Sequence, residues 1–275
     1  MKIAVLSGKG GTGKTTVAAS LAQVVENSQY VDCDVEEPNG FLFLRPDISD
    51  SQEVHVLIPE VDANLCTLCG ACARICQFNA IAVTKNRVLI FPELCHHCGA
   101  CALVCEPQAI TEVERRIGVI ESDQGENVLQ GRMDVGEPVG VPLITALKQQ
   151  INPDRPVILD CAPGASCGVV RSLDGCDYAV LVTEPTPFGL HDLKIAAELV
   201  SLMGIPAGVV INKSDSENTT IEAFCRESNL PVLMHLPFSR IVAENYSRGF
   251  LPVSDNPEWT ENFRKLYRQI AQEVR

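Results

Sequence analysis

A glycine-rich stretch decides how this chain folds: Gly8-Lys9-Gly10-Gly11-Thr12-Gly13-Lys14-Thr15-Thr16, which follows the apolar run at 3–6. A buried strand that leads through such a turn into a helix is the context of a phosphate-binding P-loop, because backbone N–H groups and the helix N-terminus both attract anions. In this pattern Lys14 binds the β- and γ-phosphates, Thr15 ligates Mg²⁺ and Thr16 contacts the α-phosphate. The whole stretch is therefore predicted to bind a nucleotide with Mg²⁺.

The composition limits the class of protein. The chain has 275 residues, 46% of them hydrophobic, which is enough for one large domain or two smaller ones. No apolar run is long enough for a secretion signal or a membrane span, so we expect a cytoplasmic protein without a stable membrane anchor. The net charge of −13 argues against attraction to nucleic acid or to an anionic membrane.

Lys9 is not required by the P-loop pattern, which already has its lysine at Lys14. With the surrounding glycines it gives KGGTGKT, a form that resembles the deviant Walker A motif of the MinD, ParA, Mrp and nitrogenase iron protein ATPases. In that family the early lysine crosses a dimer interface to the ATP of the partner subunit. The resemblance implies an ATPase that forms an ATP-dependent homodimer, with Lys9 and Lys14 as catalytic residues.

Acidic residues follow two apolar strands. The pattern Asp-x-Asp-x-x-x-x-Asn at Asp32, Asp34 and Asn39 resembles the first switch of the same family, in which the second aspartate activates the attacking water. That role carries over to Asp34, whereas Asp32 is expected to cap the strand end and support the Mg²⁺ shell. The strand at 156–160 ends in Asp160, the Walker B position, which is placed to hold Mg²⁺ together with Thr15.

Two further positions take their roles from the resemblance. The segment 160–167 resembles the second switch, D-x-x-P-G, and ends at Cys167. Mrp and nitrogenase-type ATPases hold a bridging [4Fe–4S] cluster with cysteines of both subunits, so Cys167 is a candidate for such a cluster, although the full cysteine pattern of those proteins is absent. Asn212 follows the apolar strand 207–211 at the position where the family reads adenine, and a simple turn asparagine is the alternative.

Eight of the thirteen cysteines lie in an internal repeat. Residues 66–81 align with residues 95–110 at an offset of 29 residues, with nine identities in sixteen positions. Each copy has the spacing C-x₂-C-x₂-C-x₃-C, which is that of bacterial ferredoxins with two [4Fe–4S] clusters. Zinc fits poorly, because structural zinc sites use two cysteine pairs separated by a loop.

In two-cluster ferredoxins the fourth cysteine of each run ligates the other cluster. Carried over to this chain, that crossover gives one cluster held by Cys66, Cys69, Cys72 and Cys105, and a second held by Cys76, Cys95, Cys98 and Cys101. His96 and His97 lie between ligands and are predicted to be exposed loop residues rather than ligands.

Apolar strands that alternate with helices predict an α/β fold with a doubly wound, mostly parallel sheet and ligands at the strand C-termini. The expected domains are a first ATPase part at 1–58, an inserted small α+β ferredoxin domain at 59–113 and a second ATPase part at 114–275. A short strand at 55–58 is expected to end at Pro59, and another covers 117–121. A helix at 259–274 is expected to pack its apolar face on the core.

The whole chain resembles MinD-superfamily ATPases that carry an inserted ferredoxin domain. The leading functional hypothesis is an ATPase whose nucleotide state controls electron transfer from two [4Fe–4S] clusters to an unidentified partner protein. An ATP-dependent carrier that delivers iron–sulfur clusters to an acceptor is an alternative. A positioning ATPase like MinD, with the clusters as structural elements, is another.

Overall fold

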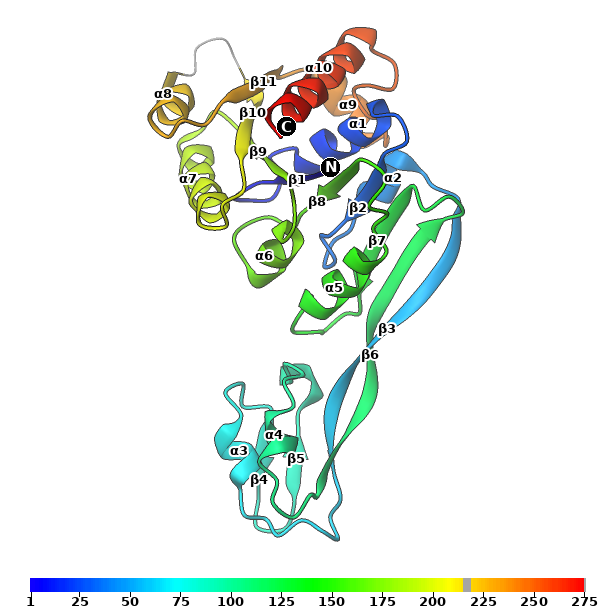
Figure 1. The fold of residues 1–275 in the computed structure, drawn as a ribbon, viewed down its shortest axis with the longest axis vertical. Coiled ribbons are helices and arrows are strands. Elements are labelled where there is room, and N and C mark those ends of the chain that lie inside the picture. Colours follow the sequence, from blue (N-terminus) through cyan, green and yellow to red (C-terminus); the bar gives the residue numbers. More distant parts are fainter. Residues whose placement is uncertain (215–218, 275) are drawn as a thin grey trace.

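The computed structural model describes residues 1–214 and 219–274, and within them a nine-stranded sheet forms the centre of the molecule. The strand order is β11-β10-β9-β1-β8-β2-β7-β6-β3, parallel from β11 to β7, whereas β6 runs antiparallel to both β7 and β3. Figure 1 shows this sheet inside a body of helices, from which a long arm extends to a small separate unit. The predicted doubly wound, mostly parallel α/β sheet is confirmed.

The strands are short and buried in the middle of the sheet and long at its antiparallel edge. Their bounds are β1 Lys2–Leu6, β2 Gln29–Asp32, β3 Ile48–Val61, β4 Ile81–Val83, β5 Val88–Ile90, β6 Ile110–Asp123, β7 Val128–Met133, β8 Val157–Asp160, β9 Tyr178–Thr183, β10 Ala207–Ser214 and β11 Val232–Pro237.

Helices cover both faces of the sheet. Their bounds are α1 Lys14–Val24, α2 Gly40–Leu44, α3 Ala71–Ile75, α4 Ala100–Leu103, α5 Val141–Gln149, α6 Cys167–Leu173, α7 Pro187–Leu202, α8 Thr219–Glu227, α9 Arg240–Ser247 and α10 Pro257–Glu273, with a 3₁₀ turn at Pro92–Leu94. None of the described helices combines the length and the apolar character needed to cross a membrane.

Two apolar layers hold the body together, one on each face of the sheet. The first packs side chains of α5, α6, α7 and α8 against the strands, and the second packs α1 and α10 on the opposite face. Phe263, Leu266 and Ile270 of α10 are buried there, and Trp259 and Val274 pack against them. The predicted core-packing role of the C-terminal helix is confirmed.

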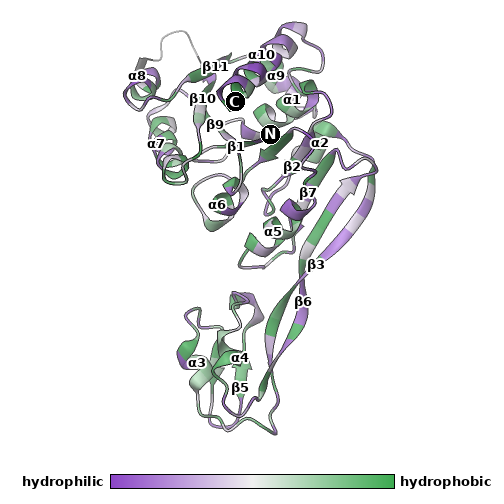
Figure 2. Cartoon of the chain, viewed as in Figure 1, coloured by the Kyte–Doolittle hydropathy of each residue, from purple (hydrophilic) through white to green (hydrophobic). Residues whose placement is uncertain are grey.

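The arm consists of β3 and β6, which pair over their full length and carry residues 62–109 at their far end. Pairing slips by one residue between Val54 and His55, which leaves Ile117 unpaired on β6. Such a bulge increases the local twist of a ribbon. Figure 2 shows mostly hydrophilic residues along the part of the ribbon that runs beside the body and hydrophobic ones in the unit at its end.

The strand expected at 55–58 is wrong in length, because β3 continues through Pro59 to Val61. A proline lacks the N–H that a central strand needs, but β3 is the edge of the sheet and pairs on one side only. The predicted limits at 58/59 and 113/114 thus fall inside two continuous strands. Strand β7 and helix α9 have no counterpart among the predicted elements.

The unit at the end of the arm repeats itself as the sequence does. Short helices α3 and α4 occupy equivalent places in the two copies, and β4 pairs with β5. Left-handed backbone recurs at pairs of residues 29 apart: Leu68 and His97 both have a φ of 56°, and Asn79 and Gln108 have φ values of 56° and 54°. The two copies therefore share their local geometry as well as their cysteine spacing.

Candidate functional site

The glycine-rich stretch forms a turn between β1 and α1, at the carboxyl edge of the parallel strands. Gly13 caps α1 with a φ of 95°, and a Cβ atom there would lie 2.1 Å from the side-chain nitrogen of Asn212. Only glycine fits this position without strain. The N–H groups of the first turn of α1 are left to face a ligand, as in other anion sites.

Lys14 lies at the centre of a buried network of charges. Its ammonium group donates to Oδ1 of Asp160 at 2.8 Å and lies 3.6 Å from Oδ2 of Asp34. Burial alone would lower the pKa of Lys14, but the two carboxylates outweigh it and raise the pKa above its ordinary value. The fully buried Tyr30 hydroxyl donates to the other oxygen of Asp160 at 2.9 Å.

Asp32 fixes the loop that carries Asp34. Its carboxylate accepts hydrogen bonds from the backbone N–H groups of Asp34, Asn39 and Gly40 at 3.1, 3.0 and 2.9 Å. Burial, followed by the nearby charge of Asp160, raises the pKa of Asp32 to about 7. The expectation that Asp32 caps the strand end agrees with these bonds.

Lys9 does not face the nucleotide side of its own turn. It forms an ion pair with Glu184, directly after β9, and Lys213 reaches the other oxygen of the same carboxylate at 3.2 Å. Lys213 also donates to the carbonyl oxygen of Gly11 at 3.0 Å. Hydrogen bonding from Lys9 lowers the pKa of Glu184, which stays ionised near neutral pH.

A cavity of about 460 Å³ opens beside the turn. Its lining brings together most of the residues expected to act on the nucleotide: Gly10, Gly11, Gly13, Lys14, Thr15, Thr16, Asp34, Asn39 and Asn212. Gly8, Lys9, Thr12 and Asp160 are not part of this lining, and Lys14 connects the buried Asp160 to it. Asn39 belongs to this lining, and its side-chain oxygen is buried without a hydrogen-bond partner among the described residues.

The other wall of the cavity comes from the end of β10 and from the segment that follows β11. Asn212 donates through its side-chain nitrogen to the carbonyl oxygen of Thr12 at 2.7 Å, so in this structure it braces the phosphate turn. Phe238 and Tyr246 line the same wall, and Tyr246 stacks on Phe43 with ring centroids 4.5 Å apart.

Sequence reasoning missed three residues of this site. Tyr30 and Glu184 bind the two residues with the clearest roles, Asp160 and Lys9, and Tyr246 reaches the cavity from the unpredicted helix α9. A usable signal existed only for Glu184, which is a carboxylate at the end of an apolar strand, the same signal that identified Asp160.

The eight cysteines of the repeat lie at the far end of the arm, around two hollows. The hollow further from the body, here called the distal cysteine site, is lined by Cys66, Cys69, Cys72 and Cys105, next to Val61 and Ile110. The proximal cysteine site is lined by Cys76, Cys95, Cys98 and Cys101, next to Leu57, Pro59 and Glu112. Both quartets combine three cysteines of one copy with the last cysteine of the other.

No group of three or more His, Cys, Asp or Glu side chains converges on a single-ion position within residues 1–214 and 219–274. The thiols of both quartets are free. The backbone N–H of Ala71 lowers the pKa of the exposed Cys69 thiol, whereas burial raises the pKa of Cys72 and of Cys101. Four thiols around each hollow, rather than around one point, suit a ligand with several metal atoms.

The two histidines between the cysteines differ from each other. His96 is exposed, as predicted, and stacks on Phe78 with ring centroids 3.6 Å apart. The prediction that His97 is exposed is wrong: both of its ring nitrogens are buried and have no hydrogen-bond partner among the described residues. The left-handed backbone at His97 turns the side chain toward the proximal cysteine site, whose lining it joins.

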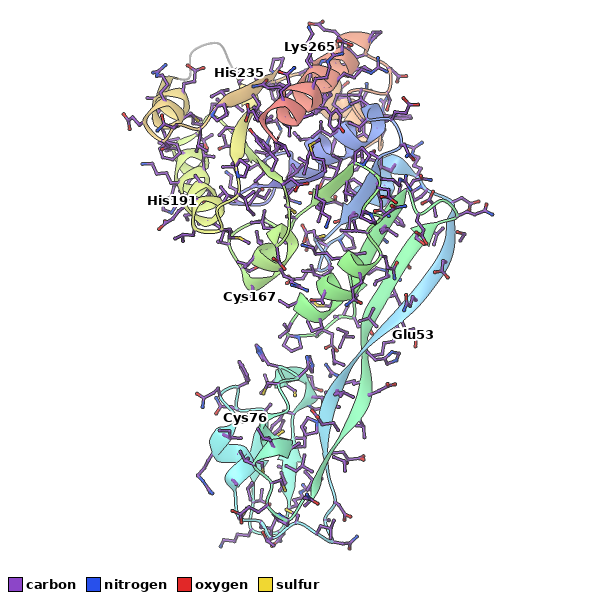
Figure 3. All side chains as sticks on the ribbon, viewed as in Figure 1. Glu53, Cys76, Cys167, His191, His235 and Lys265 are labelled. Carbon is purple, nitrogen blue, oxygen red and sulfur yellow. The ribbon has the colours of Figure 1, made fainter. Side chains whose placement is uncertain are left out.

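Cys167 stands apart from both quartets. It is the exposed first residue of α6, and Figure 3 shows it at the edge of the body that faces the unit at the end of the arm. Cys76, labelled in the same view, belongs to the proximal site and lies across the gap.

The sheet, the glycine turn and the cavity at the carboxyl edge define a P-loop nucleotide-binding protein. The family described as the CobQ/CobB/MinD/ParA nucleotide binding domain matches residues 3–253, and the chain belongs to this family. An uncharacterized protein of Methanocaldococcus jannaschii, MJ0578, is 32% identical over 282 residues, with 99% of this chain and 97% of that protein aligned. The alignment therefore includes the arm and the cysteine repeat.

Solved structures show the same fold. The cell division ATPase MinD of Pyrococcus furiosus has a TM-score of 0.57 at 23% identity, with 99% of this chain and 98% of that chain covered. The septum site-determining protein MinD of Pyrococcus horikoshii, solved with Mg-ADP, has a TM-score of 0.57 at 20% identity, with 99% and 96% covered.

Proposed function

We propose that this protein is an ATP-hydrolysing homodimer whose nucleotide state controls electron transfer through two [4Fe–4S] clusters to a partner protein. The body binds ATP, and residues 59–113 act as an inserted ferredoxin domain. Support comes from the nucleotide cavity, from the two four-cysteine hollows and from an ion pair between the arm and the body.

The residues present suit both groups. Thr15 and Asp160 offer the oxygen ligands that Mg²⁺ prefers, and Asn39, whose side-chain oxygen has no partner among the described residues, belongs to the lining of the nucleotide cavity. The two quartets match the crossed ligand sets of two-cluster ferredoxins, and a cube takes its four thiolates on four different iron atoms. Such clusters, when bound, accept and release one electron at a time.

In the nucleotide site, Lys14 exchanges its bond to Asp160 for the β- and γ-phosphates, and Asp34 orients and deprotonates the attacking water. Lys9 leaves Glu184 and completes the site of the partner subunit, as the family resemblance implies. Asn212, already against the phosphate turn, is proposed to contact the adenine.

The observation that carries the coupling is an ion pair between the arm and the body. Arg115 on β6 pairs with Glu137, whose side chain is only 9% exposed. Glu137 lies shortly after Met133, at the end of β7. The N–H of Met133 donates to the carbonyl oxygen of Val35 at 2.8 Å, and Val35 is next to Asp34. At the other end, β6 continues from Arg115 back to Glu112, which lines the proximal cysteine site. The ion pair thus lies on a route from the loop of Asp34 to the strand that borders the proximal cysteine site.

The test is an anaerobic redox titration followed by EPR, with and without MgATP, on protein that contains about eight irons per chain. We expect nucleotide to shift a cluster potential by about 59 mV, a tenfold change for one electron, with the reciprocal effect on ATP affinity. Glu137→Gln should remove the shift. The matched control is Glu121→Gln, which breaks the 2.8 Å pair with Arg132 on the body side of β6 and should keep it.

A different result would select another function. Clusters that transfer intact to an apo acceptor protein, without a nucleotide-dependent potential, would indicate an iron–sulfur carrier. Stable clusters without either behaviour would leave a positioning ATPase with structural clusters. A bridging cluster at Cys167 is a separate proposal, supported by the exposure of that thiol. It predicts more than eight irons per chain in the ATP-bound dimer, reduced to eight by Cys167→Ser.

A further inference from the structure

The two cysteine sites are related by the repeat but are not lined alike. At three equivalent positions, 29 residues apart, the distal site has Thr67, Leu68 and Pro107, whereas the proximal site has His96, His97 and Phe78. Glycines, alanines and cysteines occupy most of the other equivalent positions in both linings. The repeat therefore offers an internal comparison in which the backbone is shared and these side chains differ.

His97 is the member of this set with an unmet bonding capacity. Its two ring nitrogens are each buried and lack a partner among the described residues. A neutral imidazole always carries one N–H donor, and a buried donor without an acceptor is unfavourable. Leu68, with the same φ of 56° at the equivalent place, has no donor to offer. None of the described residues supplies the missing acceptor, so we look for it in a bound group.

We propose that His97 donates an N–H hydrogen bond to a sulfur atom of the cluster in the proximal cysteine site and thereby raises its reduction potential above that of the distal one. This inference rests on the proposed clusters. Reduction adds negative charge to a cluster, and an N–H dipole directed at its sulfur stabilises that charge. His97 is proposed to tune the cluster by this hydrogen bond and not to ligate iron, since four thiols already surround the site.

The positions of the two sites along the arm determine in which direction this difference in potential would move an electron. The proximal site touches Leu57 and Pro59 on β3, whereas the distal site touches Val61, further along the same strand from the body. With the higher potential at the proximal site, an electron that enters at the end of the arm comes to rest next to the body. The same part of the arm carries Arg115, whose ion pair with Glu137 reaches the body.

The test uses exchanges between the two copies of the repeat. His97→Leu places the distal residue in the proximal site, on a backbone that already accepts leucine at the equivalent position. In an EPR-monitored titration we expect the higher of two potentials to fall by about 59 mV, a tenfold loss of reduced cluster at fixed potential. Leu68→His should raise the lower potential by a similar amount. His97→Gln, which keeps an N–H donor, should retain most of the original higher potential.

Iron content separates this inference from the proposed function. Fewer than four irons per chain in the unaltered protein would reject the clusters themselves. Eight irons with potentials unchanged in His97→Leu would reject only the role of His97. If the His97→Leu protein does not bind iron, a second measurement on a chain that retains His97 still tests the inference. Reduced His96→Thr protein with ¹⁵N-labelled histidine should show hyperfine coupling from one imidazole nitrogen, and its absence would overturn the inference.

Discussion

The body and the unit at the end of the arm are stabilised in different ways. The body has two apolar layers, and strands such as β1 and β9 are buried almost throughout. In the unit, the described residues form one small cluster of four buried side chains, of which two are the cysteines Cys72 and Cys101. A domain of this size rarely stabilises itself by an apolar core alone, and metal ligation commonly supplies the difference.

We therefore expect the body to keep its fold independently of the cysteine sites, and the unit to depend on the proposed clusters for its fold. The antiparallel arm separates the two, so a change in one need not unfold the other. Any coupling between the two parts then depends on the few contacts at the base of the arm, such as the ion pair of Arg115 with Glu137.

The largest expected effect is that of iron removal. Chelation under reducing conditions should leave the body folded and make residues 62–109 sensitive to protease, because the apolar cluster there is too small to hold the chain. Limited proteolysis with mass spectrometry measures the cleavage sites, and fluorescence of Trp259 reports the body. Resistance of the iron-free unit to protease would contradict this account of its stability.

A substitution in the nucleotide site should impair the body and leave the cysteine sites unchanged. We expect Asp34→Asn to slow ATP hydrolysis by about 10² to 10⁴-fold, because the amide cannot accept the proton of the attacking water. Iron content should stay at that of the unaltered chain, since Asp34 is remote from the distal and proximal cysteine sites. Hydrolysis that persists at the original rate would remove Asp34 from the mechanism.

The charge network also gives the body a pH dependence. Because burial raises the pKa of Asp32 to about 7, the native chain holds a proton there that the unfolded chain releases near pH 4. The unfolding free energy of the nucleotide-free body should therefore fall as pH rises from about 5 to about 7, by at most about 1.4 kcal/mol per pH unit. Urea titration followed by Trp259 fluorescence measures it, and Asp32→Asn should flatten the slope.

The smallest expected effect concerns Lys9. Its pair with Glu184 must break before the lysine can reach a partner subunit, so Glu184→Gln should strengthen ATP-dependent dimerisation up to about fivefold, the range of a partly exposed ion pair. Analytical ultracentrifugation with a non-hydrolysable ATP analogue measures the dissociation constant. Lys9→Ala, as the control, should weaken the dimer. Weaker dimerisation of Glu184→Gln would assign the carboxylate to the interface instead.

Local patterns in the sequence determined a large part of this molecule. The glycine turn, the apolar strands that end in Asp32, Asp160 and Asn212, and the cysteine spacing depend on neighbouring residues, which constrain each other through backbone conformation and hydrogen bonding. From them follow the parallel sheet and the place of the nucleotide cavity, and both agree with the structure.

Only the tertiary structure decided which distant residues meet. Glu184 with Lys9, Tyr30 with Asp160 and Arg115 with Glu137 are separated by up to 175 positions, and no periodicity or spacing encodes such pairs. The sheet edge likewise decided that Pro59 lies within a strand, since a missing N–H is harmful only where a second strand would pair. The burial of His97 also had no local signal, because it depends on how two copies of one repeat fold against each other.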